Sequence, residues 1–173
     1  MGRKYRRPIK RGPKSDPQQY RVYRMEFEAI SSCGYISLTQ RTLRRFARMV
    51  CRQYGVRPPR LVFKDIGRWA GEWAPPTFPG KRPIITLNPA KRGSLDLIVL
   101  AHELAHHLHW VIAADLDQEQ HGPQFMACYL SILDTARLLP LVAMEAVCKM
   151  YRIRYIHPGK TSRQLLRRVR RSC

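Results

Sequence analysis

The residues of this 173-residue chain best suited to chemistry are its histidines, because five of the six fall between residues 102 and 121. His102, Glu103 and His106 form the pattern H-E-x-x-H, and His121 follows fifteen residues after His106. Imidazole is a common ligand of zinc in proteins. This grouping of histidines therefore predicts a zinc site.

Helical geometry explains the spacing within the motif. Residues four apart on an α-helix point nearly the same way, one turn apart, so His102 and His106 can bind one zinc ion. Glu103 is turned by about 100° from His102 and does not bind the ion with the two histidines. We expect Glu103 to be the catalytic residue, with a water activated jointly by zinc and this carboxylate.

Two further histidines of the same helix are poor third ligands. His109 lies on the face of His102 but about 10.5 Å further along the axis, too far for the two to share an ion. His107 is turned by about 140° from His102 and faces away from the site. We expect both side chains to lie at the surface or around the site, outside the ligand set.

The third ligand must come from another part of the chain, and His121 is the best candidate. Residues 110–120 give the chain room to return, and Gly122 and Pro123 open the next helix. Weaker alternatives are the acids of the intervening loop, which we expect to be solvent-exposed: Asp115, Asp117 and Glu119.

The two motifs together resemble those of the SprT-like (Spartan-type) zinc metallopeptidases, in which H-E-x-x-H is followed at similar spacing by H-G-x-x-F. Here the second motif is His121-Gly122-Pro123-Gln124-Phe125, and the resemblance covers roughly residues 37–137. It implies that His102, His106 and His121 bind zinc and that Glu103 is the catalytic base. Family members act on proteins bound or crosslinked to DNA. Many carry a zinc ribbon or a long regulatory tail, and this sequence has basic arms in their place.

The motif helix is predicted over residues 94–113, with Ser94 as its N-cap and Asp96 in its first turn. It is apolar around most of its girth, which indicates that it is buried. A second clear helix spans residues 37–54, where Ser37 and Gln40 fit a capping box. Further helices are predicted at 123–139 and 141–151.

The remaining folded segments read as strands. Residues 20–30 alternate and suggest a strand or an extended lead-in. Residues 60–64 form a strand, and a hairpin turn is expected at Gly71. Residues 82–89 have proline at both ends, which favours an edge strand that could take up an extended substrate by strand addition. The fold class is therefore α+β and zincin-like: a small, mostly antiparallel sheet packed on the active-site helix, with flanking helices.

Charge divides the chain into three parts. The net charge is +20, and seven Lys and Arg in residues 1–14 and nine in residues 149–173 are accompanied by no acid. We interpret residues 1–19 as a disordered basic arm, 20–151 as the SprT-like domain and 152–173 as a basic tail. Such arms are typical of proteins that bind nucleic acid, and we expect DNA in preference to RNA.

The predicted nucleic-acid contacts lie in both arms and on the acid-free face of the helix at 37–54. They are Arg3, Lys4, Arg6, Arg7, Lys10, Arg11, Arg41, Arg44, Arg45, Arg48, Arg163, Arg167, Arg168, Arg170 and Arg171.

Three functions fit these features. The first is a zinc-dependent endopeptidase acting on nucleic-acid-associated proteins. The second is a non-enzymatic nucleic-acid-binding or assembly protein that retains zinc for structure. The third is an H-E-x-x-H peptidase that cleaves a regulatory protein. The five cysteines have no C-x-x-C pair, and the chain shows neither a secretory signal nor an apolar span. We therefore expect a cytoplasmic or nucleoid-associated protein with reduced thiols, Cys51 and Cys128 being buried on helices.

Overall fold

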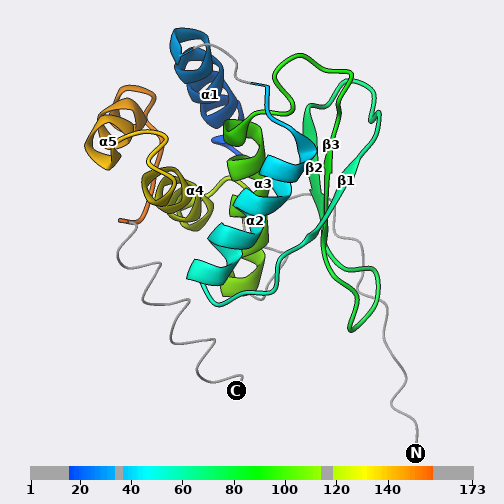
Figure 1. Ribbon diagram of the computed structural model, residues 1–173. Helices are drawn as coiled ribbons and strands as arrows, with labels where there is room; N and C mark the ends of the chain where they lie inside the picture. Colours follow the sequence, from blue (N-terminus) through cyan, green and yellow to red (C-terminus); the bar gives the residue numbers. More distant parts are fainter. Residues whose placement is uncertain (1–15, 34–36, 114–118, 158–173) are drawn as a thin grey trace, which may run out of the picture.

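The computed structural model describes residues 16–33, 37–113 and 119–157, which form five helices and three strands (Figure 1). In chain order these are α1 (Gln19–Cys33), α2 (Gln40–Gln53), β1 (Arg60–Phe63), β2 (Gly71–Ala74), β3 (Ile84–Leu87), α3 (Leu97–Ala113), α4 (Pro123–Thr135) and α5 (Leu141–Met150). The α+β class is confirmed. The predicted contacts in residues 1–15 and 158–173 lie outside the described residues.

The sheet has the strand order β1-β3-β2 and is mixed. Strand β1 pairs with β3 in parallel, with Arg60 opposite Ile84, whereas β2 pairs with β3 antiparallel, with Gly71 opposite Leu87. The prediction of a mostly antiparallel sheet was therefore wrong, because the chain crosses from β1 to the far side of β3 to form β2.

The prediction that residues 82–89 form an edge strand was also wrong, since β3 is the central strand. Pro83 and Pro89 lie just outside β3, where the sheet needs no backbone N–H donor. Pro83 contributes only its carbonyl, which accepts a hydrogen bond of 2.8 Å from the backbone N–H of Arg60. The exposed edge near the motif helix belongs to β2 instead.

The turn between β1 and β2 lies at Gly67, not at Gly71. Gly67 has a φ of 67°, in the left-handed region that favours glycine, and its N–H donates to Asp65 Oδ1 at 2.8 Å. Gly71 is instead the first residue of β2.

Residues 19–33 form a helix, so the predicted strand over 20–30 was wrong. Gln18, Val22 and Met25 are buried at helical spacing, whereas Tyr20 is 75% exposed. The alternation of Tyr20 and Val22 was misleading because aromatic residues such as Tyr20 and Phe27 lie on the solvent-exposed face of α1. Asp16 and Gln18, assigned to the basic arm, also belong to the folded domain.

For two helices, the capping residue in the structure lies two residues after the one predicted. Thr39, not Ser37, caps α2, its hydroxyl accepting from the N–H of Thr42 at 3.2 Å. Asp96, not Ser94, accepts from the first turn of α3, at 2.7 Å from the N–H of Ile98. The hydroxyl of Ser94 donates to the carbonyls of Asn88 and Lys91 and so stabilises the loop between β3 and α3.

The helices α4 and α5 are confirmed, and α4 ends earlier than predicted. It stops at Thr135, and Arg137 adopts a φ of 53° ahead of Pro140. Beyond α5, Ile153 is buried and the N–H of Ile156 donates to the carbonyl of Pro123, so the first residues of the predicted basic tail pack on the domain.

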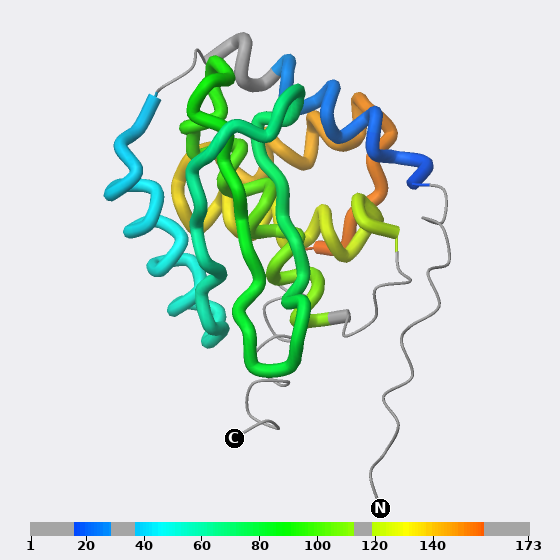
Figure 2. The backbone as a smooth tube through the Cα atoms, turned by 90° about the vertical axis from the view of Figure 1, so that its right-hand side faces the viewer, coloured from blue at the N-terminus to red at the C-terminus, as the bar shows by residue number. Residues whose placement is uncertain are grey.

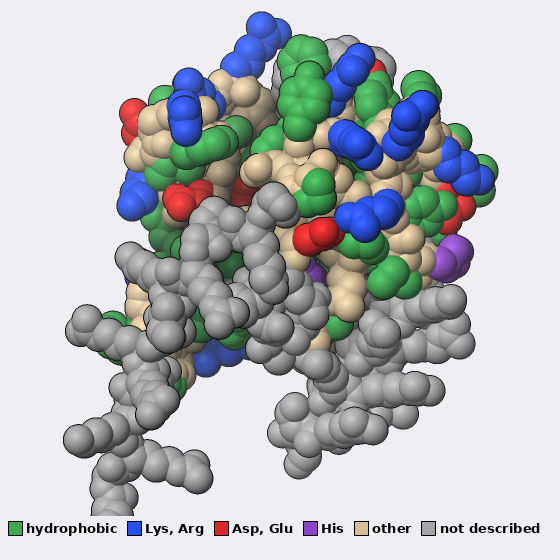
Figure 3. Space-filling model, turned by 180° about the vertical axis from the view of Figure 1, so that it is seen from behind, with side chains coloured by type: hydrophobic (Ala, Val, Ile, Leu, Met, Phe, Trp, Pro, Cys, Tyr) green, Lys and Arg blue, Asp and Glu red, His purple; other side chains and the backbone are tan. Residues whose placement is uncertain are grey.

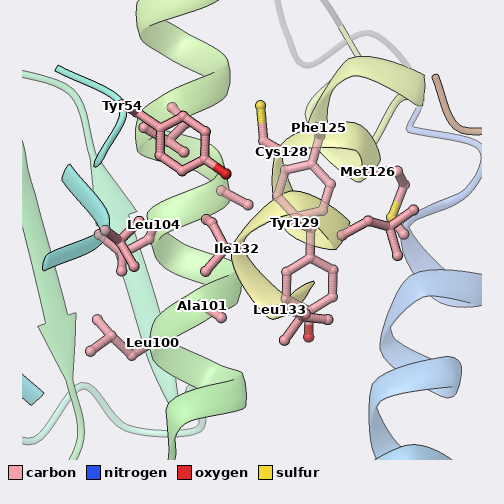
Figure 4. Packing of buried hydrophobic residues seen from close by; sticks show 14 of the residues in the cluster. Tyr54, Leu100, Ala101, Leu104, Phe125, Met126, Cys128, Tyr129, Ile132 and Leu133 are labelled. Carbon is pink, nitrogen blue, oxygen red and sulfur yellow. The ribbon is translucent and has the colours of Figure 1, made fainter. Parts of the chain in front are cut away.

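The motif helix α3 lies in the centre, with the sheet on one side and α4 on the other (Figures 1 and 2). Figure 2 shows α2 beside the β1 edge of the sheet and α1 on the other side of the molecule. Figure 4 shows Leu100 and Leu104 of α3 on the side of the sheet, whereas Ala101 of α3 lies toward Ile132 and Leu133 of α4, and all five are buried. The motif helix is therefore packed on both sides.

The described cysteines are consistent with the predicted interior positions. Cys51 and Cys128 are free and buried on α2 and α4, and Cys148 on α5 is likewise free and buried. Burial raises the pKa of Cys51 to about 12, so its thiol stays protonated and unreactive. Among the described helices, none combines the length and apolarity needed to cross a membrane.

Candidate metal centre

Three imidazoles converge on one point between α3 and the start of α4. The Nε2 atom of His102 lies 3.1 Å from that of His106 and 3.2 Å from that of His121. Two ligands of a tetrahedral zinc ion, each about 2.1 Å from the metal, lie about 3.4 Å apart. The three ligand atoms therefore fit a single metal ion, and the structure places all three predicted ligands together.

Carboxylates from the N-terminal part of the chain hold two of these rings. Nδ1 of His102 lies 2.6 Å from Glu26 Oε1, and Nδ1 of His121 lies 2.6 Å from Asp16 Oδ2. The backbone N–H of His121 also donates to Asp16 Oδ2, at 3.1 Å. A ring whose Nδ1–H donates to a carboxylate presents its Nε2 lone pair to a metal.

Metal binding requires neutral imidazole, and the protonation preferences of two of the three rings favour this form. Burial and the neighbouring rings hold the pKa of His106 well below its usual value, and burial likewise lowers the pKa of His121. Burial acts to lower the pKa of His102 too, but the carboxylates of Glu26, Glu103 and Asp16 together raise this pKa.

Glu103 lies in the same cleft, a cavity of about 510 Å³ lined also by the three ligating histidines. Its side chain is buried, and the backbone N–H of Trp73 on β2 donates to it. Burial raises the pKa of Glu103 to about 7, although its hydrogen bond and the nearby His102 act in the opposite direction. A carboxyl group so placed can exchange protons with a reactant near neutral pH.

Gly71 leaves the space that the Glu103 side chain occupies. A Cβ atom at this position would lie 2.9 Å from Glu103 Oε1 and 3.0 Å from Cγ1 of Val99. Glycine is needed at position 71 because β2 passes close to α3 there. Gly71 was predicted only as a turn residue, because sequence spacing does not show which helix passes beneath it.

We expect Gly71→Ala to displace the Glu103 carboxylate and lower the rate of any reaction that depends on it, by about tenfold or more. Metal content should be unchanged because no ligand is touched. The matched control is Gly80→Ala, where nothing lies within 4 Å but φ is 82°. That variant should lose stability, by about 1 kcal/mol, and keep full activity. Steady-state rates and thermal melts of both variants would show this contrast, and equal activities would contradict it.

The second motif has a packing explanation. A Cβ at Gly122 would lie 2.9 Å from Cβ of Glu119, so only glycine lets the loop close onto the start of α4. The ring of Phe125 contacts all three ligands, with centroid distances of 4.5 Å to His106, 4.8 Å to His121 and 5.1 Å to His102. Phe125 thus forms the apolar floor of the centre.

Of the three alternative ligands, Glu119 is the one in the described residues, and it does not join the cluster. Glu119 forms an ion pair with Arg154 at 3.0 Å. Asp115 and Asp117 lie outside the described residues. His107 is outside the ligand set as predicted, but it is buried, and its Nε2 donates to the carbonyl of Arg57 at 2.9 Å. His109 is also buried, and it lines the cleft.

The chain matches no protein-family model, no curated protein and no solved structure. The geometry of the residues therefore carries the functional argument.

The predicted basic residues of α2 are solvent-exposed and lie away from the cleft, on the β1 side of the sheet (Figure 2). Residues 37–64 contain eight Lys and Arg and no acid. Arg44 stacks on the ring of Phe63 at 4.7 Å, which fixes its position beside β1. The face seen from behind also shows many Lys and Arg side chains and few acids (Figure 3). The described domain is therefore basic apart from the arms.

Sequence reasoning missed four residues of the centre: Asp16, Glu26, Gly71 and Trp73. Tyr23 was missed as well, although its ring stacks on His102 with centroids 5.5 Å apart and lines the cleft. No spacing rule connects these positions with residues 102–121. Recognising residues 19–33 as a helix would have placed Tyr23 and Glu26 one turn apart, but not against α3.

Proposed function

We propose that this protein is a zinc-dependent endopeptidase that acts on nucleic-acid-associated proteins. The observation that carries the proposal is the arrangement of three converging imidazole Nε2 atoms with the buried carboxylate of Glu103 in the same cleft. Imidazole sets of this kind suit zinc, copper, iron and nickel, and a three-histidine site with an open position is typical of catalytic zinc.

Zinc bound by His102, His106 and His121 would supply Lewis acidity, which polarises a carbonyl group and makes water nucleophilic near neutral pH. Glu103 would take the proton from the attacking water and deliver it to the leaving amine. The N–H of Trp73 orients its carboxylate, and Gly71 gives it room. Carboxylates on His102 and His121 keep the rings in the ligating tautomer.

The composition of the cleft favours a polypeptide substrate over a phosphodiester. Its described lining contains Tyr23, Trp69, Trp73, Trp110 and the carboxylates of Glu72 and Glu103, but no Lys or Arg. Phosphate-binding sites usually carry cationic side chains. Strand β2 borders the cleft and pairs only with β3 within the described sheet, so its outer edge is available to an extended peptide.

The association with nucleic acid is supported by charge. The acid-free face of α2 and the two basic arms would bind phosphates with little sequence preference, and DNA is the preferred partner. The cleft is bordered by β2, whereas α2 lies beside β1 at the opposite edge of the sheet (Figure 2), so nucleic acid and a protein substrate need not compete. We place the protein in the cytoplasm or at the nucleoid.

The proposal is tested by metal analysis combined with a cleavage assay. Purified wild-type protein should contain one zinc ion per chain, and His121→Ala should lose most of it. Wild type should cleave a DNA-binding protein, faster when DNA is present, and that enhancement should fall steeply between 50 and 200 mM salt, as expected for phosphate contacts. Wild type without stoichiometric metal, or equal cleavage by both proteins, would overturn the proposal.

A further inference from the structure

The described side chains of helix α1, residues 19–28, bury few apolar groups. Of the described side chains of α1, Val22 and Met25 are the large apolar ones that are buried. Tyr20 and Phe27 are 75% and 65% exposed. Two buried apolar side chains are a small anchor for the part of the helix that spans residues 19–28. Other contacts must contribute to holding it in place.

Several polar contacts of this segment are made with histidines of the metal centre. Glu26 of α1 bonds to His102, and Asp16, just before α1, bonds to both the ring and the backbone of His121. The side chains of both carboxylates are only 13% exposed. Between them, the amide of Gln18 donates to the carbonyl of His121. The ring of Tyr23 covers the same two histidines, with centroids 5.5 and 5.2 Å away.

The same segment is tied to the C-terminal part of the domain. Gln18 Nε2 donates to the carbonyl of Arg154 at 3.1 Å, and the N–H of Arg154 donates to Gln18 Oε1 at 3.0 Å. Arg154 in turn pairs with Glu119, two residues before His121. The ends of the described domain therefore meet beside one ligand of the centre.

We propose that Asp16 and Glu26 are positioning residues of the metal centre and that α1 acts as a clamp, whose docking and metal binding stabilise each other. This rests on the metal-binding part of the proposed function. A carboxylate on Nδ1 fixes the ring and makes Nε2 a better donor, and a bound dication in turn strengthens the attraction between that ring and the carboxylate. Such linkage is reciprocal. Metal binding should therefore stabilise the docking of α1 by the same free energy by which docked α1 stabilises the bound metal.

The first test is a zinc titration in competition with a chromophoric chelator. Glu26→Ala and Asp16→Ala should each raise the dissociation constant for zinc by about 10–100-fold. Glu26→Gln should recover part of the affinity, because its amide oxygen still accepts from Nδ1–H without a charge. The matched control is Glu28→Ala, which removes an exposed carboxylate of the same helix that pairs with Arg24. That variant should bind zinc like wild type.

The second test is amide hydrogen exchange of the wild-type protein with and without zinc. Amides of residues 19–28 should be protected by zinc, and those of α5, which contributes no ligand, should change little. The clamp is overturned if α1 exchanges equally in both states, or if Glu26→Ala and Glu28→Ala bind zinc equally well. Wild type that binds no zinc overturns the proposed function as well, so the two failures are distinguishable.

Discussion

Replacing Glu103 by glutamine is expected to reduce peptide-bond hydrolysis by about 10²–10⁴-fold, the contribution typical of a general acid–base group. The amide keeps the size and shape of the side chain, so the shape of the cleft should persist. The amide oxygen can still accept the hydrogen bond from the backbone N–H of Trp73. It cannot take a proton from water, however. Zinc stoichiometry should stay at the wild-type value, because Glu103 does not bind the ion in the proposed arrangement.

The matched control for this change is Glu72→Gln, which removes a second carboxylate bordering the same cleft. Glu72 is exposed on β2, so its loss should change the rate only a few-fold. Rates measured on one peptide substrate, with metal content determined for each sample, separate the two variants. If Glu103→Gln cleaves as fast as wild type, the chain is not a peptidase of this class, and the alternative of a nucleic-acid-binding protein with a structural metal is favoured.

The ligand set could be predicted because helical geometry is a local rule. The spacing of His102 and His106 fixes their relative direction, and the loop before His121 leaves few other routes to a third ligand. The residues that complete the centre follow no local rule. Asp16 and Glu26 lie more than seventy residues before their partners in sequence, and only the docking of α1 brings them together.

The fold was predictable to a similar extent and for the same reason. The apolar stripe of α2 specifies its helix, and β1 and β3 are recognised as short apolar runs. The order of the strands depends on which partners β3 meets after the chain has crossed the sheet, and its flanking prolines suggested an edge position that it does not occupy. Helix α1 was misread because its exposed face carries aromatic residues that mimic strand alternation.

The largest effect on stability is expected from Phe125→Ala. This side chain is fully buried in α4 and contacts the rings of all three ligands and of Tyr129. Its truncation should lower the free energy of unfolding of the metal-free protein by about 3–5 kcal/mol, through lost burial and the cavity left behind. It should also weaken zinc binding, since His106 and His121 would lose the surface that fixes their orientation.

Denaturant unfolding of the metal-free protein and a zinc titration would measure both effects. Phe78→Ala is the matched control, because Phe78 is 68% exposed in the loop between β2 and β3. It should change stability by no more than about 0.5 kcal/mol and leave zinc binding intact. Phe125 would then be the residue through which folding and metal binding depend on each other. Without its ring, a chain that retains all three histidines and Glu103 would no longer keep the histidines in a metal-binding arrangement. Equal stability of the two variants would contradict this role for Phe125.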